Sequence, residues 1–110
     1  MDKKTAIDGL AALAHETRLE VFRLLVKAGP EGLAAGAIGE TLGVRQNTMS
    51  SHLAILNRAG LITNSRDGRV IRYRAHYGQM RELLLYLLED CCSGNAEICS
   101  PLVEAARCAC

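Results

Sequence analysis

Gly43-Val44-Arg45-Gln46-Asn47-Thr48-Met49-Ser50-Ser51-His52-Leu53-Ala54-Ile55-Leu56-Asn57-Arg58, residues 43–58, is the stretch that decides the fold. Met49, Leu53 and Leu56 are spaced i, i+4 and i+7, which predicts a helix from about Gln46 to Arg58 with one apolar face. The opposite face carries small and polar side chains: Asn47, Ser51, Ala54 and Arg58. We therefore expect this helix to pack on a core with one side and to meet a partner with the other.

The residues before this helix predict three more helices. Two short ones are marked by apolar residues at helical spacing, and the second ends at Gly29-Pro30. Gly32-Leu33 is expected to be a connector. A weaker third helix contains Gly36 and Gly39, each of which costs about 1 kcal/mol relative to alanine. The apolar positions are Ile7, Leu10, Ala11 and Ala14, then Leu19, Phe22, Leu25 and Val26, then Ile38 and Leu42.

A tight turn at Gly43-Val44 joins the third and fourth helices, which is typical of a helix-turn-helix. Gly60 ends the fourth helix. Two strand-like segments then flank Asp67-Gly68, a dipeptide that suits a two-residue hairpin turn, and they predict a wing from Leu61 to Arg66 and from Arg69 to Ala75. The fold class is therefore mainly α with a small β-hairpin, a winged helix-turn-helix in the order α-α-α-α-β-β-α.

A last helix is predicted from about Gly78 to Asp90, and it is apolar nearly all round. Its apolar residues are Met80, Leu83, Leu84, Leu85, Tyr86, Leu87 and Leu88. Such a helix needs two neighbours. We expect it to pack on its own domain with one face and, together with the first helix, on a second subunit with the other, which makes the protein a homodimer.

The chain has 110 residues, which suits one domain, and its 49% hydrophobic and 23% charged residues are ordinary for a globular protein. Its first residues lack the apolar core of an export signal, and the longest apolar run, Leu83 to Leu88, is far shorter than the ~20 residues that cross a bilayer. We expect a cytoplasmic protein with no membrane partner. It divides into a DNA-binding and dimerisation domain at 1–90 and a cysteine-rich sensor tail at 91–110.

The formal net charge is only +1, but the charges are unevenly distributed. Between Arg45 and Arg74 six arginines stand against one acid, Asp67, a local charge of +5. The remaining seven basic and eleven acidic residues give −4. A basic segment inside an acidic body predicts a polyanionic partner, here double-stranded DNA.

The fourth helix offers the side chains that bind DNA. Asn and Gln make paired hydrogen bonds to adenine, Ser and Thr contact bases or phosphates, and a helix N-terminus favours a phosphate. His52 lies beside the apolar stripe, so a place at the border of the core and a phosphate contact both stay open for it. The alternative for the others is a capping cluster on a solvated helix. The predicted contacts are Gln46, Asn47, Thr48, Ser50, Ser51 and His52.

The wing gives a separate argument. A two-residue turn at Asp67-Gly68 places Arg66 directly opposite Arg69, where like charges repel unless a polyanion lies between them. Arg72 lies on a basic side of the second strand. We expect Arg66, Arg69 and Arg72 to contact DNA, and the alternative is an ordinary solvated hairpin that carries arginines for solubility.

Four motifs, taken together, resemble the arsenical-resistance repressor family (ArsR/SmtB). The resemblance runs from about Ala11 through Tyr73 and implies a dimeric winged-helix repressor that leaves its operator when a soft metal or metalloid binds. Arg45 departs from the pattern, because many members have serine there, which is a better N-cap. The motifs are Ala14-His15-Glu16-Thr17-Arg18-Leu19, Met49-Ser50-Ser51-His52-Leu53-Ala54-Ile55-Leu56, Ala59-Gly60-Leu61-Ile62 and Arg66-Asp67-Gly68-Arg69.

All five cysteines follow Asp90, and their odd number disfavours a disulfide framework. Thiolates select soft ions, and trivalent arsenic takes three sulfurs in a pyramid. Cys91, Cys92 and Cys99 supply that number if Ser93-Gly94-Asn95 reverses the chain. We therefore expect arsenite, As(III), as the inducer, with Sb(III) as a second candidate and no organic cofactor.

The resemblance adds that two other sensor positions of the family look empty here. Residues 34–37 hold no Cys-x-Cys box, and His76 has no second histidine at the spacing of a zinc site. The Cys-Cys-x6-Cys arrangement is similar to that of members that sense arsenite or antimonite at a C-terminal triad. We expect the bound metalloid to pin the tail against the last helix and so to move the two DNA-binding helices out of register.

Other functions stay open at this point. The thiols could respond to oxidation, or Cys108 and Cys110 could complete a zinc or cadmium site rather than take no part. Cys91 and Cys92 could also be small apolar residues that end a dimer helix. None of the three histidines lies in a motif that suggests a base for a cysteine nucleophile, so we expect no enzyme. A pure interaction module does not explain the concentrated positive charge.

Overall fold

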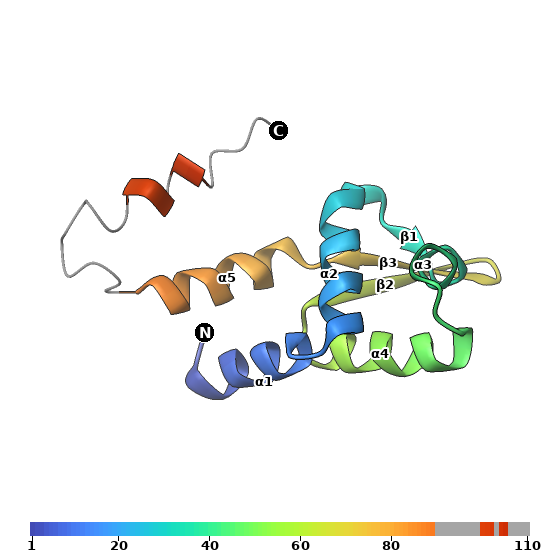
Figure 1. Cartoon of the computed structure of the whole chain (residues 1–110), viewed down its shortest axis with the longest axis horizontal. Coiled ribbons are helices and arrows are strands. Elements are labelled where there is room, and N and C mark those ends of the chain that lie inside the picture. Colours follow the sequence, from blue (N-terminus) through green and yellow to red (C-terminus); the bar gives the residue numbers. More distant parts are fainter. Residues whose placement is uncertain (90–99, 103, 106–110) are drawn as a thin grey trace.

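The structure is a computed structural model that describes residues 1–89, 100–102 and 104–105 (Figure 1). Most of the predicted sensor tail, all five cysteines included, lies outside the described residues. The elements are α1 (Lys3–Leu13), α2 (Glu16–Ala28), the short 3-10 helix η1 (Gly29–Glu31), β1 (Leu33–Ala34), α3 (Ala35–Leu42), α4 (Gln46–Arg58), β2 (Ile62–Asp67), β3 (Val70–Ala75) and α5 (Tyr77–Leu88).

One apolar core joins the helices to the sheet. Met49, Leu53 and Leu56 of α4 are almost completely buried, as their spacing predicted. Phe22 and Leu25 of α2 lie in the same buried cluster. Burial of this stripe fixes the rotation of α4 about its axis and turns its polar side to solvent.

The structure confirms a helix at α1 and shows which side of it faces the domain. Ile7 and Leu10 are 55% and 41% exposed, whereas Ala6, Gly9 and Ala12 are buried. A Cβ added to Gly9 would lie 3.6 Å from a methyl group of Leu83 in α5. Small residues let α1 approach its neighbours closely, so the larger residues of the predicted stripe are left on the outside.

The sheet has three antiparallel strands in the order β1-β3-β2, one strand more than predicted. Leu33 and Ala34 of β1 pair with Tyr73 and Arg72 of β3. A strand of two residues is too short to show an alternating pattern, so the sequence predicted only a connector there. This third strand ties the segment between α2 and α3 to the wing, the hairpin formed by β2 and β3.

Gly32 makes the pairing of β1 possible. Its φ is +65°, and a Cβ there would meet the backbone oxygen of Tyr73. Both the left-handed backbone and the lack of space exclude a side chain. Gly32, which belongs to no apolar pattern in the sequence, thus allows β1 to join the sheet.

α5 buries one side chain, Leu83, against the domain and leaves most of its leucines in solvent. The Tyr77 hydroxyl donates to the backbone oxygen of Val26, 3.1 Å away, and fastens the start of α5 to the end of α2. α1 and α5 project together from the end of the domain opposite the wing (Figure 1). The exposed leucines are Leu84, Leu85, Leu87 and Leu88.

Two glycines form a matched pair for a stability test. Gly32→Ala should lower the free energy of unfolding by more than about 1 kcal/mol, because the backbone oxygen of Tyr73 occupies the place of the new methyl group. Gly36→Ala in α3 should leave it unchanged or raise it, because nothing lies within 4 Å of a Cβ there and alanine favours a helix. Chemical denaturation of both variants measures the difference. Equal stabilities for the two would contradict the close approach of β1 and β3.

Candidate nucleic-acid interface

The turn between α3 and α4 depends on two glycines. Gly43 ends α3 in the left-handed conformation, with φ of +66°. The next amide, that of Val44, donates to the backbone oxygen of Gly39 at 3.0 Å. A Cβ at Gly39 would lie 3.0 Å from the oxygen of Val44. The glycine that weakens α3 as an isolated helix is therefore the residue that lets α4 begin so close to it.

Arg45 occupies the N-cap of α4, and its side chain makes no capping hydrogen bond. The expectation that this arginine is a poor substitute for serine is therefore confirmed. Within the first turn, the Asn47 Oδ1 accepts a hydrogen bond from the amide of Thr48 at 2.9 Å. The Ser50 hydroxyl donates to the backbone oxygen of Gln46, also at 2.9 Å.

The outward face of α4 carries the predicted DNA contacts. Asn47 and Ser51 lie opposite the buried stripe, Thr48 and Ser50 lie at its two sides, and Gln46 is exposed at the start of the helix. α4 thus offers amide and hydroxyl groups, without an acidic residue, over its first two turns. The exposed residues are Gln46, Asn47, Thr48, Ser50 and Ser51.

His52 differs from these residues because it lies at the border of the core. Its ring packs against that of His15, with 4.6 Å between the ring centroids, and its Nδ1 is buried without a hydrogen-bond partner among the described residues. Burial, and after it the nearby His15 and Arg18, lowers the pKa of His52 below its ordinary value of 6.5. Burial thus disfavours the charged form of this ring.

His15 has a structural role of its own. Its Nδ1 accepts a hydrogen bond from the amide of Thr17 and so caps α2. Three residues further on, the Arg18 Nε donates to the backbone oxygen of Ala12 and joins the end of α1 to α2. His15 and Arg18, both in the Ala14–Leu19 motif, thus cap α2 and join it to α1.

The register of the wing corrects one prediction. Asp67 pairs with Val70 and Arg66 with Ile71, so the two turn residues are Gly68 and Arg69. Arg66 therefore does not lie opposite Arg69, and the predicted repulsion between them is absent from the ladder. The reason is that hairpin turns of both common types need a positive φ at the first turn position, and Gly68, with φ of +67°, takes it. Arg69 is left exposed at the tip of the wing.

Arg72 and Arg74 are occupied by the protein itself. The Arg74 guanidinium donates to the backbone oxygen of Pro30 at 2.9 Å and to the Ser65 hydroxyl at 2.8 Å. Arg72 donates to the backbone oxygens of Glu31 and Gly32 at 3.3 and 3.4 Å. These contacts fix the wing to the segment that precedes β1. Sequence reasoning missed this role, because carbonyl acceptors forty residues away leave no local pattern.

A further hydrogen bond links the wing to α4. The Asn64 side-chain amide donates to the Asn57 Oδ1 at 3.2 Å. At the tip, the Arg66 Nε donates to the backbone oxygen of Gly68 at 3.3 Å. The exposed face of α4 and the tip of the wing therefore belong to one hydrogen-bonded unit.

The predicted thiol site, Cys91, Cys92 and Cys99 with Cys108 and Cys110, lies outside the described residues. His76, the one histidine of the last helix, caps α5 by accepting a hydrogen bond from the amide of Gln79 at 2.9 Å. Within residues 1–89, 100–102 and 104–105 no group of three or more His, Cys, Asp or Glu side chains is arranged to hold a metal ion. None of the helices described there is long and apolar enough to cross a membrane.

Comparison with known proteins agrees with this architecture. A family model described as a helix-turn-helix domain matches residues 13–64. The putative arsenical resistance operon repressor ArsR2 of Halobacterium salinarum is 32% identical over 93 residues, which is 84% of this chain and 75% of that protein. The putative arsenical resistance operon repressor ArsR of the same organism is 38% identical over 65 residues, but these span only half of its length and 59% of this chain.

Two solved structures share the fold. One is the homodimeric winged helix-turn-helix DNA-binding domain of Mb0332 from Mycobacterium bovis, a possible ArsR-family regulator, at 27% identity and a TM-score of 0.65 over 77% of each chain. The other is reduced HlyU from Vibrio cholerae, at 27% identity and a TM-score of 0.63 over 78% of this chain and 90% of that one. The chain belongs to the ArsR/SmtB family of winged helix-turn-helix transcriptional regulators.

Proposed function

We propose that this regulator is a homodimeric repressor that binds double-stranded operator DNA and leaves it when As(III) or Sb(III) binds to the thiolates of Cys91, Cys92 and Cys99. The observation that supports DNA binding is the exposed polar face of α4, together with the exposed Arg66 and Arg69 at the wing tip. A helix of this kind fits the major groove, where amide and hydroxyl groups distinguish base pairs. Arg69 then meets the phosphate backbone at the edge of the site.

The dimer part is supported by the apolar faces of α1 and α5. Leu84, Leu85 and Leu87 are 49%, 57% and 49% exposed, and Ile7 and Leu10 of α1 project from the same end of the domain. Several exposed apolar side chains on two helices that contact each other are unusual on a monomer and are typical of a subunit interface. The similar Mb0332 domain is described as homodimeric. A two-fold axis at this end would present two copies of α4 to successive major grooves.

The inducer part rests on the thiols and on their place after α5. Leu88 ends α5, and Cys91 and Cys92 follow within four residues. Thiolates select soft ions such as As(III) or Sb(III), and two relatives carry the name of arsenical resistance operon repressors. A ligand that draws the chain after α5 into a fixed position changes the α5 surface that meets the second subunit. Allosteric coupling of this kind typically requires about 1–3 kcal/mol.

α5 is also well placed to pass this change to the DNA-binding elements. Leu83 packs in the core, and Tyr77 is hydrogen-bonded to the end of α2. A Cβ on Gly60, directly after α4, would lie 3.7 Å from the Gln79 side chain. A shift of α5 therefore acts on the chain between α4 and β2, the two elements that hold the DNA contacts.

A second candidate is a regulator that responds to oxidation of the same thiols. Its support is the similarity to HlyU, of which one structure is described as the reduced form, together with five cysteines that have no disulfide pattern in the sequence. Oxidation would join Cys91 or Cys92 to another cysteine and release the DNA without a metalloid. A zinc or cadmium regulator of the same fold, with Cys108 and Cys110 as added ligands, is distinguished by the same experiment.

Arg69→Ala should weaken operator binding and lower the slope of log K against log salt by about 0.9, because one phosphate contact is lost. Lys4→Ala, on exposed α1 at the other end of the domain, is the matched control and should leave the slope unchanged. Fluorescence anisotropy of a labelled promoter fragment at several salt concentrations measures both slopes. If Arg69→Ala keeps the slope of the unmodified protein, the wing tip does not contact DNA.

Cys91→Ser, Cys92→Ser and Cys99→Ser should each bind the operator normally and fail to leave it on addition of arsenite, because each removes one of three sulfurs. Cys108→Ser and Cys110→Ser are the matched controls and should still be released. The measurement is anisotropy of the promoter fragment during titration with arsenite, antimonite, cadmium, zinc and peroxide in turn. Release of all three variants by arsenite would show that the site is elsewhere, and release by peroxide alone, reversed by a reductant, would favour the redox regulator.

A further inference from the structure

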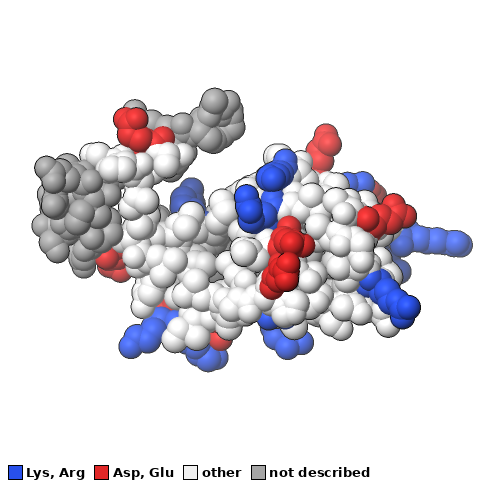
Figure 2. All heavy atoms as spheres, viewed as in Figure 1, with Lys and Arg blue, Asp and Glu red and all other residues white. Residues whose placement is uncertain are grey.

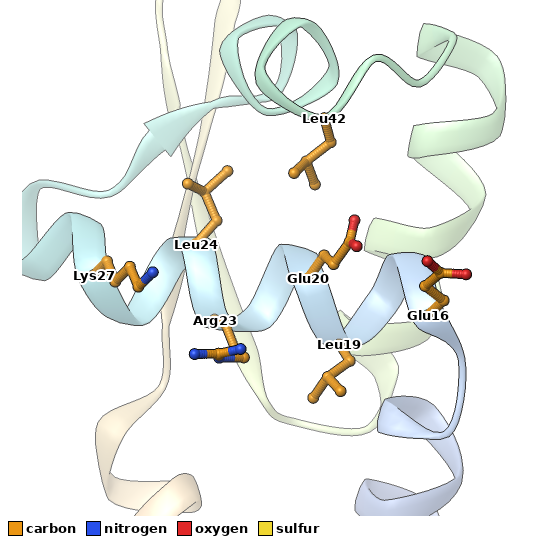
Figure 3. A pocket seen from close by; sticks show the side chains of 7 residues that line it. All are labelled: Glu16, Leu19, Glu20, Arg23, Leu24, Lys27 and Leu42. Atoms are coloured by element: carbon orange, nitrogen blue, oxygen red, sulfur yellow. The ribbon is translucent and has the colours of Figure 1, made fainter.

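A shallow groove of about 390 Å³ runs along the outer face of α2 (Figure 3). None of its lining residues belongs to α4 or to the wing, so the DNA-binding surface does not account for it. Six of the residues come from α2 and one from α3: Glu16, Leu19, Glu20, Arg23, Leu24, Lys27 and Leu42.

The side chains form two edges along the helix. Figure 3 shows Leu19 and Arg23 directed to one side and Glu20 and Leu24 to the other, toward Leu42 of α3. Leu19 belongs to the apolar period that predicted this helix, but it is 44% exposed. Figure 2, in the same view as Figure 1, shows acidic and basic side chains next to each other over the centre of this face.

The order of these residues has a two-fold symmetry. The six α2 residues of the groove form a stripe along the helix. The midpoint of this α2 stripe lies between Val21 and Phe22, which are both buried beneath it. Every residue of the stripe has a counterpart equally far on the other side of this midpoint. The pairs are Glu16 with Lys27, Glu20 with Arg23 and Leu19 with Leu24. Each acid is thus matched by a base, and the one leucine by the other.

We propose that this groove binds the α2 helix of a second copy of the chain in antiparallel orientation. A two-fold axis through the midpoint brings Glu16 to the level of Lys27 of the partner subunit and Glu20 to the level of Arg23 of the partner subunit. Four complementary charge pairs then surround Leu19, which is exposed in the single chain, and the half-buried Leu24. Such an interface is isologous, since the same patch is used by both copies.

The positions of the acidic and basic residues along α2 have a simpler explanation, but this explanation does not apply to the leucines. Acidic residues at the start of a helix and basic ones at its end complement the helix dipole. However, Glu16 and Glu20, like Arg23 and Lys27, are one turn apart, and like charges at this spacing destabilise a helix by about 0.2–0.5 kcal/mol per pair. The dipole also gives no reason for Leu19, which is 44% exposed at the edge of the groove. A second copy offsets the like charges and covers the leucines together.

The composition of the groove also selects the partner. Two acids and two bases give it no net charge, which disfavours DNA or another polyanion. A contact of one helix pair is small and partly held by screened surface charges, so we expect it to be weak in free solution. Two copies bound to one DNA molecule have a high effective concentration, which makes such a contact effective there.

This contact is separate from the proposed α1 and α5 interface and does not depend on arsenic binding. If both interfaces exist, dimers associate into tetramers or longer assemblies through α2. If the α1 and α5 interface does not exist, α2 joins monomers into dimers. The two hypotheses can therefore fail independently, because substitutions of Glu20 and Arg23 change the association through α2 in either case.

The test uses charge reversal, with sedimentation velocity of the full chain at low ionic strength as the measurement. Glu20→Arg and Arg23→Glu should each abolish the heavier species, because each places like charges opposite each other. Mixing the two single variants should restore it, because the arginines of one variant then face the glutamates of the other. The double variant Glu20→Arg with Arg23→Glu should restore it as well. Circular dichroism checks that every variant is folded.

The matched control is Lys4→Ala, which changes charge outside the groove and should leave the association unchanged. The proposal is overturned if the unmodified protein, at the highest concentration reached, shows no species heavier than the monomer or, where the α1 and α5 interface exists, than the dimer. It is equally overturned if folded single variants associate as well as the unmodified protein, or if the mixture and the double variant stay dissociated. Anisotropy with a fragment that holds one operator should give the same affinity for all variants.

Discussion

Burial of three side chains of α4 is the constraint on which the rest of the site depends. Met49, Leu53 and Leu56 are at most 1% exposed, and a helix held on three successive turns cannot rotate about its axis. The opposite face, which includes Asn47 and Ser51, is therefore fixed in the direction of solvent. The short turn through Gly39 and Gly43 sets where this face begins, so the same packing that stabilises the domain also positions its DNA contacts.

The wing depends on a second set of interactions, which are polar and long-range. Arg74 donates hydrogen bonds to Pro30 and Ser65, and Arg72 donates to two backbone oxygens before β1. Asn64 donates to Asn57 of α4. Hairpins of two strands are only marginally stable alone. The third strand and these side chains give this hairpin a fixed direction relative to α4, and they leave Arg66 and Arg69 exposed at its tip.

The elements with a strong apolar period were predictable from the sequence. The bounds of α4, Gln46–Arg58, agree with the prediction, and so does the buried stripe. β1 was missed because two residues carry no period. In α1 the apolar period predicted the helix, but the side that packs on the domain is formed by the small residues Ala6, Gly9 and Ala12 rather than by Ile7 and Leu10. The turn of the wing shifted by one residue because Gly68 is needed at the position with positive φ.

The predicted DNA contacts also differ in how far the local sequence determines their surroundings. Side chains whose direction follows from the helical period, such as Asn47 and Ser51, lie on the exposed face of α4. His52 and Arg72 depend on tertiary neighbours, the ring of His15 and the carbonyls of Glu31 and Gly32, which no local pattern reveals. The thiols follow α5 in the sequence, and their role in releasing DNA is a hypothesis about chemistry rather than about packing.

The central claim is that the exposed face of α4 recognises an operator sequence. The most direct measurement is the ratio of affinities for the promoter fragment next to the protein's own gene and for unrelated DNA of the same length, in the unmodified protein and in Asn47→Ala. If the claim is right, Asn47→Ala lowers this ratio roughly 5- to 150-fold, which corresponds to about 1–3 kcal/mol of binding free energy, while the salt dependence stays the same. An unchanged ratio in a folded variant would contradict it.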